Sequence, residues 1–275
     1  AKDLAAGLKN RFGDAVRPAD DTSDMLTIQT GQDNIKSVLA YLKHEAPTRF
    51  ERLEDYTAID ESARRNRDQY PDFTLVYHLT AFEPATRMRV KVPLSGEYPD
   101  APSISNLWPS ANWYEREIYD MFGINFPEHP HLRRLIMPAD WEGHPLRKSH
   151  PGRANEMPPY TEKQARELQP WGGEEYFDPA ADEEALILNL GPHHTATHGL
   201  LRLIVKLESE TITGLDLDVG YHHRSVEKLG ERQTWLQFIP YTDRVDYMAG
   251  AANNLPYMMA VEQLAGIKVP ERAEY

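Results

Sequence analysis

Cysteine is absent from the 275 residues of the chain. Without thiolates, the chain by itself cannot form a disulfide, a thiolate zinc site or a cysteine-ligated iron–sulfur cluster. Positive charge is also scarce, because 30 lysines and arginines face 43 acidic residues and leave a formal net charge of -13. Proteins that bind phosphate backbones usually present a basic face, so we expect no nucleic acid among the partners. Long apolar runs are missing too, and the longest are far shorter than the ~20 residues of a membrane-spanning helix.

The composition that remains, 40% hydrophobic and 27% charged, is that of an ordinary globular protein, and we predict an α+β fold. Residues 1–150 are expected to form a first domain. Apolar spacing predicts helices at 4–12 and 35–42, the second with Asp33 as its N-cap. Strands are predicted at 25–29, 73–80 and 87–93, with a turn at 83–86 that pairs the last two.

Nine prolines lie between positions 127 and 179, and a stretch so rich in proline forms no long helix or central strand. We therefore predict an extended linker over residues 151–183 and a second domain over residues 184–275. That domain is expected to contain strands at 185–190, 201–207 and 211–219, a helix at 226–238, and a last helix that starts near Asp243 and bends at Pro256. The first of these strands is almost entirely apolar, and we expect it to be buried.

The densest group of chemically active side chains is the sequence GPHHTATHG at residues 191–199. It joins two predicted strands, so its histidines are expected at the tip of a hairpin, where binding residues are often displayed. One interpretation is a zinc site from His193, His194 and His198, although the proline and glycines argue against a helix that would place two of them on one face. A second is a serine or threonine hydrolase, for which the sequence offers no nucleophile elbow.

A third interpretation is a histidine and a tyrosine that donate hydrogen bonds to a bound redox ligand. Histidine titrates near neutral pH and tyrosine stays protonated. Such a pair suits a quinone carbonyl, which takes up protons as electrons arrive. Buried structural histidines are the remaining alternative, and the residues alone leave all of these open.

Residues 109–123 have a helical period and end at Gly123, a natural C-terminal stop. The face expected to meet the core carries Trp113, Ile118 and Met121. The acidic side chains fall elsewhere, and we expect a solvated face or salt bridges rather than catalysis for Glu115, Glu117 and Asp120.

The following stretch, residues 129–148, is rich in proline, aromatic and basic residues and has little periodicity. A basic patch on this otherwise acidic chain is predicted from Arg133, Arg134, Arg147 and Lys148. We favour docking to another protein over ligand binding for this patch.

Several long motifs resemble those of respiratory NADH:quinone oxidoreductase, complex I. ANWYEREIYDMFGI at 111–124 and HPLRK at 144–148 are similar to its C subunit. The histidine motif, GYHHRSVEK at 220–228 and YTDRVDY at 241–247 are similar to its D subunit. Together they resemble the bacterial form in which C and D are fused. The D family continues past the region that matches residues 271–275, so we expect a fragment that ends early within the D part, or one piece of a split subunit.

The resemblance implies a C-subunit-like α+β domain followed by the start of a domain like the large subunit of nickel–iron hydrogenases. The two thiolate positions of the hydrogenase nickel motif match Asp246 and Ala249 in this chain. A nickel–iron centre needs thiolates, so we expect no bound metal.

The resemblance also implies a quinone-headgroup site. Its quinone-binding and catalytic residues would be His198 and Tyr247, and Arg244 would lie near the terminal iron–sulfur cluster of a partner subunit. His194 and Asp246 are additional candidates, expected to act through the residues that touch the quinone. Asp243 and Asp246 are the acidic candidates within this chain for biasing the proton of His198.

The implied partners are the B-type iron–sulfur subunit, the I-type and G-type peripheral subunits, the membrane-arm H-type subunit and quinone itself. Quinone is the expected substrate, and the cluster belongs to a partner, so we expect no cofactor bound by this chain. The implied activity is that of a proton-pumping NADH:quinone oxidoreductase on the cytoplasmic side of the bacterial inner membrane, with the chain inactive alone. A non-catalytic scaffold of the same or a hydrogenase-like membrane complex is the alternative.

Overall fold

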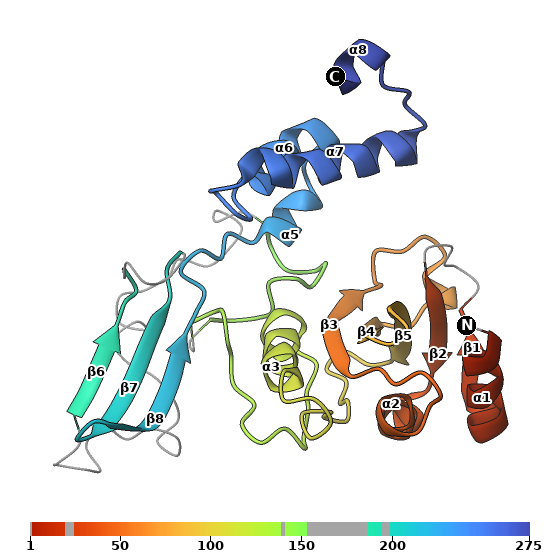
Figure 1. The fold of residues 1–275 in the computed structure, drawn as a ribbon, viewed down its shortest axis with the longest axis horizontal. Coiled ribbons are helices and arrows are strands. Elements are labelled where there is room, and N and C mark those ends of the chain that lie inside the picture. Colours follow the sequence, from red (N-terminus) through yellow and green to blue (C-terminus); the bar gives the residue numbers. More distant parts are fainter. Residues whose placement is uncertain (1, 20–24, 139–140, 153–185, 194–198) are drawn as a thin grey trace. The chain divides into compact units, whose positions relative to one another are not determined.

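The computed structural model describes residues 2–19, 25–138, 141–152, 186–193 and 199–275 (Figure 1). The chain forms two compact units, one of Ala1–Pro151 with Asn155–His222 and one of Gly152–Ala154 with His223–Tyr275. Helices and strands occur together, which confirms the mixed α+β prediction. The predicted domain boundaries stay a prediction, and the linker expected at 151–183 lies almost entirely outside the described residues. In the described ranges, no helix is long and apolar enough to cross a membrane.

A five-stranded sheet forms the centre of the first unit (Figure 1). Its strand order is β1-β2-β5-β4-β3, with β2 and β5 parallel and the other neighbours antiparallel. The strands are β1 (Val16–Pro18), β2 (Leu26–Thr30), β3 (Arg52–Asp60), β4 (Phe73–Ala81) and β5 (Thr86–Leu94). The predicted strands at 25–29, 73–80 and 87–93 and the hairpin between the last two are therefore confirmed.

The sequence patterns missed β1 and β3. β1 is only three residues long, too short to show a period. In β3 the register shifts between Leu53 and Asp55, so the buried side chains Leu53 and Tyr56 are three residues apart instead of two. A bulge of this kind interrupts the alternation from which a half-buried strand is recognised.

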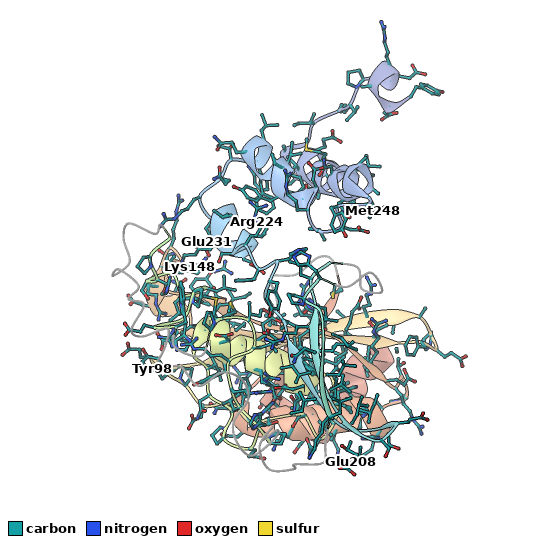
Figure 2. The ribbon with its side chains drawn as sticks, turned by 90° about the vertical axis from the view of Figure 1, so that its left-hand side faces the viewer. Tyr98, Lys148, Glu208, Arg224, Glu231 and Met248 are labelled. Atoms are coloured by element: carbon teal, nitrogen blue, oxygen red, sulfur yellow. The ribbon has the colours of Figure 1, made fainter. Side chains whose placement is uncertain are left out.

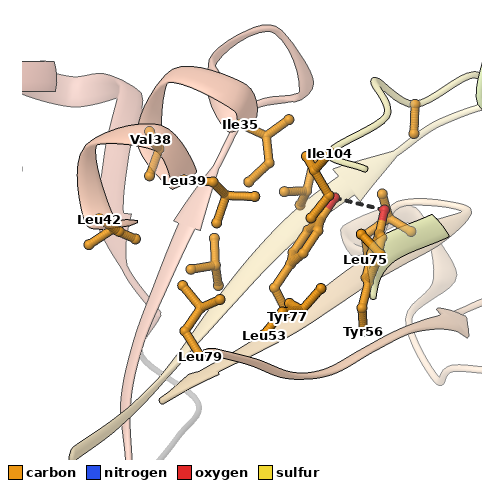
Figure 3. Close-up of a cluster of buried hydrophobic side chains, with 14 of the residues drawn as sticks. Ile35, Val38, Leu39, Leu42, Leu53, Tyr56, Leu75, Tyr77, Leu79 and Ile104 are labelled. Carbon is orange, nitrogen blue, oxygen red and sulfur yellow. Dashed lines mark hydrogen bonds between the residues drawn. The ribbon is translucent and has the colours of Figure 1, made fainter. Parts of the chain in front are cut away.

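Helices α1 (Lys2–Phe12) and α2 (Ile35–His44) confirm the predicted apolar spacing. Figure 3 shows Ile35, Val38, Leu39 and Leu42 of α2 within the core that the sheet contributes to, and all four are fully buried. Each such burial stabilises the fold by about 1.5–3 kcal/mol. The predicted N-cap was wrong, because Asp33 lies in a 3-10 turn, η2 (Gln32–Asn34), and Asn34 precedes α2 without a side-chain capping bond. Two further 3-10 turns are η1 (Gly13–Ala15) and η3 (Arg67–Gln69).

Helix α3 (Ala111–Phe122) lies against β3, and Gly123 ends it in the left-handed conformation, as predicted. The Tyr114 hydroxyl donates a hydrogen bond of 3.1 Å to the Glu54 carbonyl oxygen of β3. The expected distribution of side chains on α3 was partly wrong. Glu115 and Asp120 are fully buried, whereas Trp113 is exposed.

A second sheet in the first unit is the antiparallel meander β6 (Leu186–Leu190), β7 (Arg202–Glu208) and β8 (Thr211–Asp218). All three strands were predicted. The expected burial of β6 was wrong, because Leu186 is 61% exposed and Leu188 is 41% exposed.

The second unit is helical, with α5 (Val226–Gly230), α6 (Trp235–Thr242), α7 (Gly250–Ala265) and α8 (Glu271–Glu274). The single helix predicted at 226–238 is two helices. The first, α5, ends at Gly230, and Thr234 begins α6 as its N-cap, in a reciprocal capping box with Gln237. The last long helix starts at Gly250 rather than near Asp243, which instead follows the C-terminus of α6. None of the described residues of α6 and α7 is buried.

Candidate functional site

The histidine motif lies where the sequence predicted it, in the connection between the antiparallel strands β6 and β7. Of the three histidines, the structure describes His193. His194 and His198 lie outside the described residues, so their placement stays a prediction, as does the zinc alternative built on them. Within the described residues, no group of three or more histidine, cysteine or acidic side chains could hold a metal ion.

The base of this histidine loop, residues 191–201, is closed by a backbone contact. Gly191 has a φ of +93°, and a Cβ at this position would lie 2.1 Å from the Leu201 carbonyl oxygen. Only glycine allows the two ends of the loop to meet this closely. At the far side of the loop, a Cβ on Gly199 would be 3.6 Å from Nδ1 of His222, so the GYHH segment lies beside the loop.

Polar side chains on one face of the second sheet connect its three strands below this loop. The Asn189 amide oxygen accepts hydrogen bonds from Nε and Nη2 of Arg202 at 3.1 and 2.9 Å. Nη1 of Arg202 also lies 3.8 Å from Oδ2 of Asp218, and the Tyr221 hydroxyl donates to that same carboxylate oxygen. Burial raises the pKa of Asp218, and the hydrogen bond from Tyr221 opposes that rise. The sequence interpretation assigned no role to these residues. Tyr221 belongs to the GYHHRSVEK motif, whereas Asn189, Arg202 and Asp218 lie outside the motifs.

The other half of the predicted site is the connection between α6 and α7, residues 243–249. Two asparagines of α7 hold this segment. Asn254 donates a 2.6 Å hydrogen bond to Oδ1 of Asp243, and Asn253 donates a 3.0 Å bond to the Asp246 carbonyl oxygen. The Asp246 carboxylate accepts a further bond from the Met248 amide at 3.1 Å. The connection is therefore a fixed turn and not the helical turn that the sequence predicted.

This turn presents three of the predicted site residues together. Tyr247 is 56% exposed. The Arg244 guanidinium donates to the Pro240 carbonyl oxygen and lies 3.7 Å from the Asp243 carboxylate. Asp246 supports the turn through both its backbone and its side chain. Met248, labelled in Figure 2, is 77% exposed, so an apolar side chain lies next to Tyr247 in sequence.

The first unit contains a charged cluster that the sequence interpretation misjudged. Oδ2 of Asp120 accepts hydrogen bonds from the amides of Leu135, Ile136 and Met137 at 2.8–3.0 Å. Its other oxygen binds Nη1 of Arg134 at 2.7 Å. Asp120 thus ties helix α3 to the loop that follows, and its carboxylate does not belong to a solvated face.

The predicted basic patch is likewise wrong for three of its four residues, because they bind groups of this chain. Arg134 pairs with Asp120, and Arg147 donates to the carbonyl oxygens of Phe122 and Glu97 at 2.6 Å. Arg133 pairs with Asp216 of β8 at 2.6 Å. The charges of Arg133 and Arg134 are already paired with carboxylates, and Arg147 is buried, so these three side chains offer little positive charge to a partner.

The fold and motifs define a class of protein. Residues 28–156 match the family described as respiratory-chain NADH dehydrogenase, 30 Kd subunit. Over 97% of its length, the chain is 46% identical to the NADH-quinone oxidoreductase C/D subunit of Acinetobacter baylyi. It is 48% identical over 92% of its length to the protein of the same name from Acidiphilium cryptum, and 46% identical over 99% to that from Methylococcus capsulatus.

Nearly the whole chain is thus similar to NADH-quinone oxidoreductase C/D subunits, and its motifs predicted this similarity. It spans about half the length of these relatives, 46%, 44% and 48% respectively. Among solved structures, it is similar to a trypsin-resistant fragment of Nqo5, with 28% identity and a TM-score of 0.40 over 47% of this chain and 98% of that one. It is also similar to a chain of the membrane-bound sulfane sulfur reductase, an archaeal respiratory membrane complex, with 22% identity and a TM-score of 0.39 over 46% of this chain and 71% of that one.

Proposed function

We propose that this chain forms part of the quinone-headgroup site of a respiratory NADH:quinone oxidoreductase. The observation that carries the proposal is Tyr247, which is more than half exposed on a turn held by Asn253 and Asn254 of α7. A tyrosine hydroxyl on a turn that is held in place donates its hydrogen bond in a fixed direction. Donors that are in place before the reaction stabilise developing charge most effectively. In the proposed site, His198 of the histidine loop is the second donor.

Reduction of a quinone to a quinol takes up two electrons and two protons. The Tyr247 hydroxyl and the protonated His198 imidazole each donate a hydrogen bond to a headgroup carbonyl oxygen and pass a proton to it as the electrons arrive. In the complete enzyme, a terminal iron–sulfur cluster on the B-type partner would supply the electrons. This chain has no cysteine with which to bind such a cluster.

Arg244 would act on the cluster through its charge. The guanidinium side chain is 56% exposed, so its positive charge extends beyond the turn that carries it. A nearby positive charge favours the reduced, more negative form of a redox centre. Asp246 fixes the turn, and His194 and Asp243 are the further groups that would set the protonation of His198.

The resemblance to complex I also suggests the partner subunits and the location of the proposed enzyme. The enzyme is completed by the I-type and G-type peripheral subunits and by the H-type protein of the membrane arm. It works at the cytoplasmic face of the bacterial inner membrane, and the chain is inactive alone. The D part is proposed to begin a hydrogenase-like domain, joined to the C-like domain by the linker at 151–183. One alternative is a scaffold without catalytic residues, which the large exposed apolar surface of the second unit would also suit.

The substitution Tyr247→Phe separates these two functions. In the assembled enzyme it should lower the rate of NADH oxidation with a short-chain ubiquinone analogue by at least about tenfold, because one proton donor is lost. NADH oxidation by ferricyanide, which bypasses the quinone site, should be unchanged. Tyr257→Phe is the matched control, since its hydroxyl donates to the Trp235 carbonyl oxygen within the same unit. Full quinone reductase activity in Tyr247→Phe would leave the scaffold as the function of this chain.

A further inference from the structure

Arg202 of the second sheet makes polar contacts with both neighbouring strands. It is the first residue of β7, directly after the histidine loop, and lies opposite Asp218 of β8 in the strand register. Its guanidinium reaches back to the Asn189 amide on β6 and across to the Asp218 carboxylate. One side chain therefore connects all three strands at the end of the sheet from which the histidine loop emerges.

The two ends of the histidine loop meet at this same level. Gly191 and Leu201 are in backbone contact one residue away from Arg202, and Asn189 lies two residues before Gly191. Asp218 also accepts the hydrogen bond of Tyr221, whose neighbour His222 lies beside Gly199. The Arg202 interactions thus reach both ends of the loop and the segment that flanks it.

The chemistry of this contact requires arginine. The planar guanidinium donates two bonds to a single amide oxygen and still directs a third N–H group toward the carboxylate. A lysine ammonium is a compact point charge, and its reach covers one of the two acceptors at a time. The Arg202 and Asp218 side chains are 24% and 20% exposed, so solvent screens their attraction only partly.

We propose that Arg202 is a positioning residue, which holds the base of the histidine loop so that the loop presents His198 to the quinone headgroup. The role toward the quinone rests on the proposed function. The Arg202 interactions with Asn189 and Asp218, which we call the clamp, rest on the structure together with the Gly191–Leu201 contact. It touches no substrate, and its effect passes through the loop.

The first test needs no quinone. Amide hydrogen exchange is measured on peptides that cover residues 186–201, in the full chain, for Arg202→Lys and Asn189→Ala. Both variants should raise exchange at the loop base at least about tenfold, because opening of the base becomes easier. Asn189→Asp keeps an acceptor for Arg202 and should exchange like the parent chain. Unchanged exchange in Arg202→Lys, or an equal increase throughout β6, β7 and β8, would overturn the clamp.

The second test uses the assembled enzyme. Arg202→Lys should raise KM for a short-chain ubiquinone analogue about tenfold and lower kcat less, with the ferricyanide rate unchanged. Lys206→Gln, on the same strand four residues from Arg202, is the control and should leave KM unchanged. An unaltered KM in Arg202→Lys contradicts the positioning role if His198→Ala is impaired. If His198→Ala and Tyr247→Phe both retain full activity, the proposed function fails instead, and the exchange experiment still decides the clamp.

Discussion

Glu115 is the residue whose environment departs most from what its type suggests. Its side chain is fully buried, Oε1 accepts a 2.7 Å hydrogen bond from the Ile104 amide, and Oε2 has no hydrogen-bond partner among the described residues. Burial raises its pKa to about 7, against the opposing effects of the Ser103 hydroxyl and the Ile104 amide. The charged groups that influence it are Lys36 and Glu128, which pair with each other, and its charge raises the pKa of the buried tyrosines Tyr56 and Tyr77.

This raised pKa predicts how stability depends on pH. The folded chain binds the Glu115 proton more tightly than the unfolded chain, whose glutamate has the ordinary pKa of 4.5. The contribution of this bound proton to the free energy of unfolding is on the order of 3 kcal/mol. It is fully present below pH 4.5 and is lost as pH rises through about 7. Glu115→Gln stays neutral and should remove this part of the dependence, so that the variant is more stable than the parent chain at pH 8.

Urea denaturation between pH 5 and pH 9, followed by tyrosine and tryptophan fluorescence, measures the effect. Glu117→Gln, on the same helix and partly exposed, is the control and should retain the slope of the parent chain. Equal slopes for Glu115→Gln and the parent chain would show that Glu115 is charged in the folded state at pH 6.

At the scale of elements, the end of α3 depends on Gly123. Its φ of +73° lies in the left-handed region, and a Cβ there would be 2.5 Å from the His144 ring and 2.9 Å from Arg147. The Gly123 amide donates to the Tyr119 carbonyl oxygen and closes the last turn of the helix. The helix therefore stops where two side chains of the following loop cover its end.

Gly123→Ala should lower the free energy of unfolding by more than the ~1–2 kcal/mol of the backbone conformation, because His144 and Arg147 must also move. Gly13→Ala isolates the backbone contribution, since its φ of +56° is also left-handed and nothing lies within 4 Å of the added Cβ. Chemical denaturation of both variants gives the comparison. A loss in Gly123→Ala no larger than that in Gly13→Ala would mean that the neighbouring side chains adapt without cost.

At the scale of the whole chain, the most consequential feature is the apolar face of the second sheet. The strand register places aliphatic side chains in three rows across it, Leu186–Leu207–Ile212, Leu188–Val205–Leu215 and Leu190–Leu203–Leu217. The opposite face carries Asn189, Arg202 and Asp216, and Asp216 is buried by its pairing with Arg133. Ile212 is 64% exposed and Leu215 is 52% exposed, so the face has exposed apolar side chains on β6 and β8, whereas Val205 of the central strand is buried.

Such exposed apolar side chains favour association in solution. The chain by itself should self-associate at micromolar concentration, and the double substitution Ile212→Lys with Leu215→Lys should shift it toward the monomer. Gln69→Lys with Ser95→Lys adds the same charge at exposed positions outside the second sheet and serves as the control. Sedimentation velocity gives the masses. Equal association of all three proteins would show that another surface, such as that of α6 and α7, drives it.

The sequence by itself determined the features that depend on neighbouring residues. Apolar periodicity predicted α1, α2, α3 and the strands other than β1 and β3, and the long motifs predicted the similarity to C/D subunits. The grouping of Arg244, Asp246 and Tyr247 was predictable as well, because they are adjacent along the chain. The convergence of His198 with Tyr247 depends on residues far apart in sequence, and it stays a prediction.

The tertiary structure alone decided which side chains are buried and what they bind. Glu115 and Asp120 had the sequence pattern of a solvated helix face, yet amides of distant loops and a long arginine reach them in the core. The apolar β6 had the pattern of a buried strand, yet its leucines face outward. Arg202 becomes a clamp only because strand pairing brings Asn189 and Asp218 to it. Periodicity reports local geometry, whereas burial and polar pairing depend on segments that meet only after the chain has folded.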